Sequence, residues 1–588
     1  MKTVSFSDFI GSDENAKNGD CAVVMQNVLA HIKYLGEPCT LNLPKNGEIH
    51  IYKDFCPVRE YHTSNTDSVR FPQKTFGILP EDIENLTIEG NGCRFVFHGD
   101  MSALGVVWCK NITLRNFSWD FESPTTSQVT VKEVGKGYAV FEAAKGCDFQ
   151  IRHGRVQWIC GTSPYTGKPY YTQYNAHKSY CVVGFDPETK IQRRYHITQS
   201  PFARAMLCKK TGANEIRVRY FGDVPKPWQK IGMTAQMCAS RQRPTAGAFF
   251  WESEEITVDG VTPHYLHGFG WLTQMCKDVA FKNCRFVPNE DGRLCTSYAD
   301  LIHVSGAGGK IEIENCQFSH AHDDPINIHG TFTRVENRAD ANTLRLRYVH
   351  NQQGGFPQFH VGDEVIFYAR DTLAPLGGTE EIFTVVKAGK PGEDGNDMKT
   401  MTVAFDKPLP SEICDKVGAE PKYVAENVTY TPEVTVRGCT FDSIPTRGIL
   451  CTTRKKVLIE NNRFDHMAMA CIFISNDSNE WYESGPVRDM TIRSNEFFIR
   501  ETGQTEWKDA PAVYVHPVVK GSKLPETPVH KNITVENNTV HLFHDRAFVI
   551  ESVENLTVQN NKIIRESGET GSVCAITACK NINCDIQE

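Results

Sequence analysis

The sequence predicts an all-β protein, a right-handed parallel β-helix with two inserted small β-barrel domains. Two observations predict this architecture: one short phrase recurs along the chain, often at a fixed spacing, and two long segments lack that phrase. With 588 residues, the chain is also long enough to form several domains.

The recurring phrase is an apolar–polar–apolar triplet, then a polar residue and, in most copies, Asn or Gly. Such a triplet is typical of a short strand with one buried face, and Asn or Gly tolerates the left-handed backbone of a tight turn. Neighbouring copies are commonly 23 residues apart, as from Ile256 to Val279. One unit cannot bury its apolar face alone, so stacked copies predict a parallel β-helix, and the period-two alternation excludes a helical-repeat solenoid. The copies are ITLRNFSWDF from Ile112, ITVDGV from Ile256, VAFKNCRF from Val279, IEIENCQF from Ile311, VTVRGCTF from Val434, VLIENNRF from Val457, MTIRSNEF from Met490, ITVENNTV from Ile533 and LTVQNNKI from Leu556.

The phrase divides the chain into five parts. Residues 122–248 and 333–430 lack it and contain hairpin-like text such as QVTVKEVGKGYAVFEA and HVGDEVIFYARD, which predicts the two inserted barrels. Residues 1–121 form the N-terminal cap and first coils, 249–332 the central coils, and 431–588 the C-terminal coils. We expect an amphipathic helix near the start to cap the stack, and the insertions to wall a binding groove.

Composition excludes several classes of function. The net charge of -8 and the pI near 6.2 argue against a nucleic-acid partner. No stretch is long and apolar enough for a membrane-spanning helix, and the given sequence has no signal peptide. The 21 cysteines show no paired CxxC spacing, so we predict no metal site and no cofactor; Cys284, Cys316 and Cys439 each precede a Phe by two residues, as expected of buried, reduced residues in a core column.

Aligning the coils brings three carboxylates together. When LIHVSGA, PINIHGT and GILCTTR are aligned, Asp300, Asp324 and Arg447 fall in one column, with Asp323 beside Asp324. Equivalent positions on neighbouring coils lie about 4.8 Å apart, so the three aspartates should repel one another and raise the pKa of at least one. A protonated and an ionised carboxyl are what an inverting glycoside hydrolase needs. The alternative is that Asp323 and Asp324 are turn residues before Pro325.

We also expect the separation of Asp300 and Asp323 to allow inversion. They are offset by one coil and one residue, which predicts a separation in the range of roughly 6.5 to 9.5 Å that admits a water, rather than the roughly 5 to 5.5 Å of a retaining enzyme. Asp324, directly above Asp300, would share that water with it.

Candidate substrate-binding residues come from a second column and from two tryptophans. The column is polar across several coils, which is consistent either with sugar binding or with a hydrogen-bonded ladder. Trp271 and Trp481 are candidate stacking platforms for a sugar face, with burial in the core as the alternative. Arg447 would orient a hydroxyl or offset the carboxylate charge. The members of the column are Gln274, Ser305, His329, Thr452, Ser475 and Glu551.

The stretch YADLIHVSGAGGKIEIENCQF followed by SHAHDDPINIHGTF, together with the two insertions, resembles the blood-group-B-type α-1,3-galactosidases of glycoside hydrolase family 110 over nearly the whole chain. The resemblance implies an exo-acting, inverting enzyme that releases terminal α-1,3-linked galactose from an oligosaccharide, with Asp300, Asp323 and Asp324 as catalytic residues. It leaves open whether linear glycans are also substrates, and its substrate class implies a periplasmic or secreted protein. By analogy with a polygalacturonase-like arrangement, Asp323 would be the acid, with Asp300 and Asp324 holding the water.

Two other functions are consistent with the fold. The first is another β-helix polysaccharide hydrolase or lyase of the galacturonan type, which would need a cationic cleft; TTRKK around Arg454 is the only text that suggests one. The second is a non-catalytic carbohydrate-binding β-helix protein, which would have no need for three stacked carboxylates.

Overall fold

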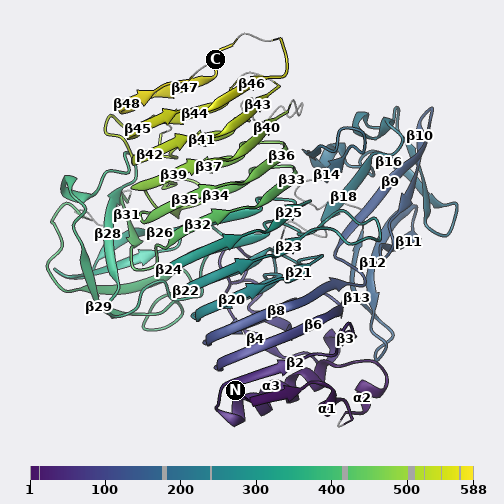
Figure 1. The fold of residues 1–588 in the computed structure, drawn as a ribbon. Helices are drawn as coiled ribbons and strands as arrows, with labels where there is room; N and C mark the ends of the chain where they lie inside the picture. The colour runs from purple at the N-terminus through teal and green to yellow at the C-terminus, as the bar shows by residue number, and fades with distance from the viewer. Residues whose placement is uncertain are drawn as a thin grey trace.

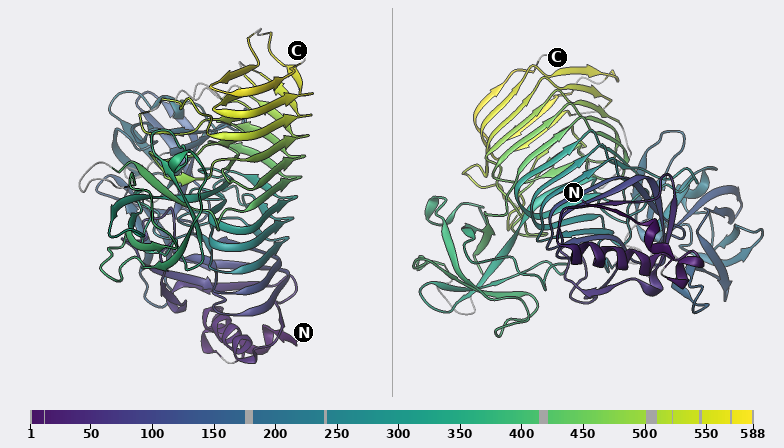
Figure 2. Two further views of the ribbon diagram at one scale, coloured as in Figure 1. Left: turned by 90° about the vertical axis from the view of Figure 1, so that its left-hand side faces the viewer. Right: turned by 60° about the horizontal axis from the view of Figure 1, so that its bottom comes forward.

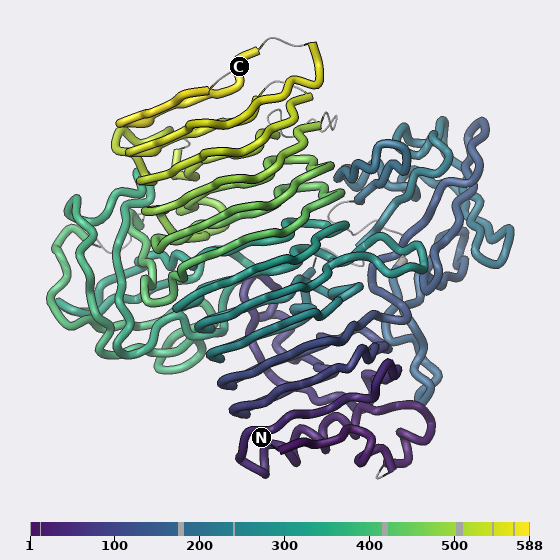
Figure 3. The backbone as a smooth tube through the Cα atoms, viewed as in Figure 1, coloured from purple at the N-terminus to yellow at the C-terminus, as the bar shows by residue number. Residues whose placement is uncertain are grey.

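The computed structural model describes residues 2–11, 13–174, 182–238, 242–413, 421–500, 510–521, 523–543, 546–568 and 571–586. One long stack of parallel β-coils runs through the molecule, with the N-terminus at one end and the C-terminus at the other (Figures 1 and 3). The structure therefore confirms the predicted parallel β-helix.

The repeated phrase forms one face of this stack. Ile256 pairs with Ile112 on one side and with Val279 on the other, and the register continues through Ile311 and Val434. The later copies continue the same column to Leu556. The strands of this face are β6 (Glu84–His98), β8 (Lys110–Phe121), β20 (Glu254–Asp259), β22 (Trp271–Lys282), β24 (Ile302–Glu314), β32 (Glu433–Arg437), β35 (Lys456–Glu460), β39 (Asp489–Arg493), β42 (His530–Glu536), β45 (Val553–Gln559) and β48 (Lys580–Cys584).

A tight left-handed turn follows this face, as the Asn or Gly predicts. Asn283, Asn315 and Gly438 have φ of 54°, 54° and 66°. The next residue points inward: Cys284, Cys316 and Cys439 are buried and free, and their column continues as buried asparagines from Asn462 onward, each bonded to the next. The second face follows the turn and consists of β23 (Arg285–Phe286), β25 (Gln317–Ser319), β33 (Thr440–Ile444), β36 (Arg463–Met467), β40 (Glu496–Ile499), β43 (Thr539–Leu542) and β46 (Lys562–Arg565).

The third face carries the aspartates. It is built from the first halves of β22 and β24, the start of β26 (Ile326–Arg338) and shorter strands above and below. The shorter strands are β5 (Gln73–Ile78), β7 (Ser102–Val107), β19 (Ala248–Trp251), β34 (Ile449–Cys451), β37 (Ile472–Ile474), β41 (Val513–Val515), β44 (Phe548–Glu551) and β47 (Cys574–Thr577).

Helix α3 (Ala22–Leu35) lies across the N-terminal end of the stack, where its apolar side buries Val24, Val28 and Ile32 against the first coils (Figure 1). This is the predicted cap. The neighbouring elements are β1 (Lys2–Ser5), α1 (Ser7–Ile10), α2 (Glu14–Lys17), β2 (Cys39–Asn42), β3 (Glu48–Tyr52), η1 (Lys53–Phe55) and β4 (Val58–Glu60). No helix in the described part of the chain has the length and apolar character needed to cross a membrane.

The two inserted domains flank the stack, the first at the right and the second at the left of Figure 1, and both lie to one side of it in the left view of Figure 2. The first contains a seven-stranded antiparallel sheet with a three-stranded sheet beside it. Its strands are β9 (Thr126–Gly135), β10 (Tyr138–Ala143), β11 (Asp148–Arg152), β12 (Arg155–Thr162), β13 (Pro169–Tyr174), β14 (Val182–Phe185), β15 (Gln192–Tyr195), β16 (Ala205–Lys210), β17 (Glu215–Tyr220) and β18 (Thr234–Cys238).

The second inserted domain is a closed antiparallel barrel. β26 continues from the coils into this barrel, and the pairing runs from β26 through β27, β30, β29, β28 and β31 back to β26. The remaining strands are β27 (Thr343–Arg347), β28 (Glu364–Ala369), β29 (Phe383–Ala388), β30 (Thr400–Phe405) and β31 (Tyr423–Asn427), and β38 (Glu483–Ser484) pairs with β26 outside the barrel.

Candidate active site

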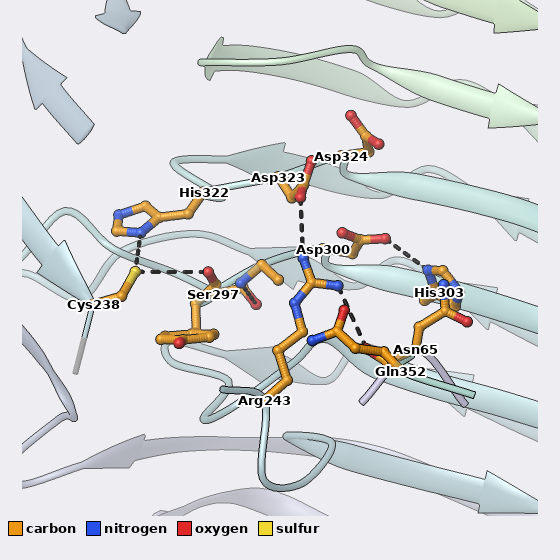
Figure 4. A network of polar contacts seen from close by, with 12 residues as sticks. Asn65, Cys238, Arg243, Ser297, Asp300, His303, His322, Asp323, Asp324 and Gln352 are labelled. Atoms are coloured by element: carbon orange, nitrogen blue, oxygen red, sulfur yellow. Dashed lines mark hydrogen bonds and ion pairs between the residues drawn. The ribbon is translucent and has the colours of Figure 1, made fainter. Parts of the chain in front are cut away.

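The three aspartates meet where two strands of the third face begin. Asp300 lies two residues before β24, and Asp323 and Asp324 lie just before β26. Ile302 pairs with Ile326, and the backbone N–H of Asp323 donates to the carbonyl of Ala299 at 3.0 Å. The predicted column is therefore correct, and the aspartates occupy neighbouring coils (Figure 4).

Their separation differs from the sequence-based expectation. One carboxylate oxygen from each aspartate lies within 4.8 Å of the others. These selected oxygens are closer than the roughly 6.5 to 9.5 Å that separates the carboxyl groups of an inverting pair. Asp323 and Asp324 share the guanidinium group of Arg447, whereas we expected the carboxylates to splay across a groove.

The carboxylates line a partly open cavity. The coils form its floor, and loops from other parts of the chain form its walls. The lining residues are Asn65, Arg243, Asp300, His303, Asp323, Asp324, Asn327, Arg447, Leu450, Trp481 and Glu483.

Asp323 is surrounded by positive charge. Arg194 Nη2 lies 2.9 Å from its Oδ1, and Arg243 Nη2 lies 3.3 Å from its Oδ2. Burial by itself would raise the pKa of Asp323, but the guanidinium groups of Arg194, Arg243 and Arg447 outweigh burial and lower it. The charges therefore favour ionised Asp323, which disagrees with the acid role implied by the polygalacturonase-like analogy.

Asp324 forms a bidentate ion pair with Arg447. Arg447 Nε and Nη2 donate to its two oxygens at 3.0 and 2.7 Å. Burial nevertheless raises the pKa of Asp324 to about 7, with Asp323 and Asp300 adding to the rise and Arg447 opposing it. Arg447 therefore contacts the carboxylates, as predicted, and helps to balance their charge.

Asp300 faces two histidines instead of an arginine. Its Oδ2 lies 2.7 Å from His303 Nδ1, and His303 Nε2 lies 3.0 Å from His329 Nε2. Burial and the negative charge of Asp323 raise the pKa of Asp300 well above its usual range, while burial and the neighbouring His329 lower that of His303. The cluster thus contains two carboxyls with a raised pKa, Asp300 and Asp324, and one with a lowered pKa, Asp323.

Of the two predicted stacking platforms, only Trp481 faces the cavity. Its ring is 40% exposed and packs against His350 with 4.3 Å between ring centroids. Trp271 has no exposed surface and packs between Trp119 and Phe281 inside the coils. The prediction that Trp271 binds sugar is wrong, because its side chain alternates into the core.

The polar column also supports structure more than binding. Gln274 is fully buried, accepts from the backbone N–H of Ser64 and donates to the carbonyl of His62, so it anchors the 61–71 loop. Thr452 donates to the carbonyl of Ser484 at 3.3 Å. Neither residue lines the cavity, so the prediction that Gln274 and Thr452 bind substrate is wrong. His329 is also buried and contacts two residues that line the cavity, His303 and Glu483.

Sequence reasoning missed several residues around the aspartates. Arg194 lies on β15 of the first inserted domain, and Arg243 follows that domain. Because insertions have no repeat register, no alignment could place these residues. The sequence did contain a signal for His303. It lies in the LIHVSGA phrase, and its column runs Leu272, His303, Asn327 and Leu450, so two polar residues interrupt an apolar column.

A pocket in which one buried carboxyl favours the protonated form and another favours the ionised form is typical of a glycoside hydrolase. Comparison with known proteins gives the family. The chain is 36% identical to "Alpha-1,3-galactosidase A" of Peterkaempfera griseoplana over 96% of its length and 76% of the relative. It is 31% identical to "Alpha-1,3-galactosidase B" of Phocaeicola vulgatus, covering 96% of this chain and 92% of the relative. The chain belongs to the α-1,3-galactosidase family.

Two further comparisons complete the picture. No family model matches the chain. Among solved structures, "Structure of Yersinia enterocolitica Family 28 Exopolygalacturonase" is similar with a TM-score of 0.40 and 8% identity, covering 100% of this chain and 79% of that one.

Proposed function

We propose that the protein is an exo-acting, inverting glycosidase that releases terminal α-1,3-linked galactose from blood-group-B-type glycans and from linear ones. The observation that carries the proposal is the cavity in which Asp300, Asp323 and Asp324 converge. The names of the relatives, α-1,3-galactosidases A and B, supply the substrate class.

The walls of the cavity support exo-action. Asp67 connects two of them: its Oδ2 accepts from the backbone N–H of Arg243 at 2.8 Å and from Gln352 Nε2 at 3.0 Å. These contacts join the 61–71 loop, the segment that follows β18 in the first inserted domain, and the second inserted domain. A joined wall favours a terminal sugar over an internal segment of a polymer.

The charges support a neutral sugar. A uronate-specific cleft needs a cation for the substrate carboxylate. The two arginines lining the cavity, Arg243 and Arg447, already contact Asp323 and Asp324. Arg454 of the TTRKK segment pairs with Glu380 and Glu426, away from the cavity. These pairings disfavour a galacturonan substrate.

The ion pairs also support water as the nucleophile. Both oxygens of Asp323 contact guanidinium groups, and so do both oxygens of Asp324. Oxygens paired in this way are weaker nucleophiles toward the sugar carbon, while the same charges keep Asp323 ionised, as a general base must be. In this proposal Asp300 donates the proton to the leaving oxygen and Asp323, kept ionised, activates a water.

The short spacing of the carboxylates is the observation that favours a retaining mechanism instead, in which a carboxylate attacks the sugar directly. The stereochemistry of the first product separates the two mechanisms.

The substrate class is tested by incubating the protein with the branched blood-group-B trisaccharide, with a linear α-1,3-galactosyl trisaccharide and with oligogalacturonate. We expect free galactose from the first two and no cleavage of the third. Cleavage of oligogalacturonate alone would contradict the proposal, and binding of these sugars without cleavage of any of them would favour a non-catalytic binding protein.

A further inference from the structure

Behind Asp300, a chain of polar groups leads away from the cavity. His303 contacts Asp300, His329 contacts His303, and His329 Nδ1 lies 2.6 Å from the backbone carbonyl of Gly330. Glu483 Oε1 lies 3.4 Å from His329 Nε2. His303 and His329 are each 1% exposed, so no bulk water competes for these contacts.

The carbonyl at the end of the chain determines the direction of every hydrogen bond. A carbonyl only accepts, so His329 Nδ1 carries a proton and donates to Gly330. A neutral His329 then has an unprotonated Nε2, which accepts from His303 Nε2. A neutral His303 in turn has an unprotonated Nδ1, which can only accept from Asp300. Asp300 must therefore carry the proton.

Packing keeps the two rings in this orientation. The edge of His303 meets the ring of Phe269 at 4.8 Å between centroids, and the His303 and His329 rings meet nearly at right angles at 4.9 Å. Both histidines sit on strands: His303 pairs with Leu272 and Asn327, and His329 pairs with Ser305. The rings cannot flip without disturbing the coil stack.

The alternative placement of these protons creates a negative and a positive charge inside the protein. If the Asp300 proton moved to His303 Nδ1, and the His303 Nε2 proton moved to His329 Nε2, the number of protons would not change. Asp300 would become negative and His329, whose side chain has no exposed surface, would become positive. Glu483 favours this arrangement and burial disfavours it. Arg243, Arg447 and Asp323 also act on Asp300 through their charges.

We infer that the carbonyl of Gly330, acting through His329 and His303, holds Asp300 in its protonated form in the resting enzyme. His303 and His329 are then positioning residues for this carboxyl. The inference deepens the proposed function, since it rests on Asp300 being one of the catalytic carboxyls.

The first experiment compares two substitutions at His329. In His329→Phe the acceptor for His303 Nε2 is lost. His303 can then carry its proton on Nδ1 instead of Nε2, donate to Asp300 and stabilise the carboxylate. The pKa of Asp300 falls, and the limb of the kcat/KM profile that Asp300 controls moves to lower pH by about one unit or more. A glutamine can donate to Gly330 and accept from His303, so His329→Gln restores the wild-type limb.

The control is His530→Phe, at a histidine that is also fully buried in the coils and accepts from Val487 N–H far from the cavity. It reports the cost of placing Phe at a buried histidine, and its pH profile should match the wild type. A His329→Phe profile that overlays the wild type would overturn the inference.

The second experiment needs no turnover. In protein labelled with ¹⁵N-histidine, His303 should carry its proton on Nε2 alone between pH 5 and 8. A proton on Nδ1, or a positively charged His329, would overturn the inference whatever the activity. Failure to release galactose from any α-1,3-galactoside would instead contradict the proposed function and leave the NMR result standing.

Discussion

At the residue scale, the site works through charges that the aspartates do not supply themselves. Asp323 depends on guanidinium groups from three parts of the chain: Arg194 from β15, Arg243 from the segment after the first inserted domain, and Arg447 from the coils. A carboxyl in this environment stays ionised although it is buried. Removing one guanidinium should therefore change titration before it changes the fold.

We predict that Arg194→Met raises the pKa of Asp323, because one of the charges that lower it is gone. The acidic limb of the kcat/KM profile should move to higher pH by about one unit, and kcat/KM at neutral pH should fall by about 10- to 100-fold. Arg219→Met, an exposed arginine in the same inserted domain, serves as the control. An unshifted acidic limb in Arg194→Met would show that Asp323 does not depend on this charge.

The two tryptophans should respond differently to truncation. Trp481→Ala removes an exposed ring beside the carboxylates, so KM should rise by about 2- to 10-fold, equivalent to about 0.5–1.5 kcal/mol of aromatic contact. Trp271→Ala leaves a cavity in the core and should cost about 3–5 kcal/mol of unfolding free energy, with KM unchanged. Urea unfolding and steady-state kinetics measure both. A rise in KM for the folded Trp271→Ala variant would restore its predicted binding role.

We also predict that the enzyme needs no metal ion. The guanidinium groups of Arg194, Arg243 and Arg447 already balance the charge of Asp323 and Asp324. Dialysis against EDTA should leave kcat/KM unchanged. Loss of activity on chelation that is restored by adding a divalent cation would contradict this prediction.

At the element scale, the repeat explains what the sequence could predict. A phrase with fixed register predicts the strands, the left-handed turns at residues such as Asn283, and the column that joins Asp300 to Asp324. Trp271 and Gln274 both lie in β22: Trp271 points into the core, and Gln274 is covered by the 61–71 loop, which the repeat could not place. The repeat could not reach Arg194 either, because an insertion has its own hydrogen-bond pattern.

Deleting residues 333–430 tests the inserted barrel as an element. Coils interact with their neighbours, so the stack should remain folded. The wall that carries Gln352 and His350 would be lost, and KM should rise. Tyr482 and Val519, which pack against apolar residues of the barrel, would also become exposed, so the solubility of the protein should fall. Circular dichroism and kinetics report the outcome, and global unfolding would show that the barrel supports the stack.

At the scale of the whole molecule, a one-dimensional stack holds a site built from distant segments. The coils place the aspartates by register, while the two inserted domains flank the stack (Figure 2): Arg194 of the first contacts Asp323, and Gln352 of the second contacts Asp67. The Asp67 contacts lock these segments together. The central claim is that this assembly hydrolyses an α-galactoside by direct attack of water. That activity would depend on residues from all of these segments together.

Proton NMR during the first minutes of hydrolysis tests that claim most directly. With an α-1,3-galactosyl trisaccharide as substrate, inversion by water gives β-galactose as the first product, and mutarotation then produces the α-anomer. The account predicts an initial β-galactose signal and no covalent glycosyl-enzyme. Initial release of α-galactose would contradict it and would favour the retaining mechanism that the short spacing of the carboxylates suggests.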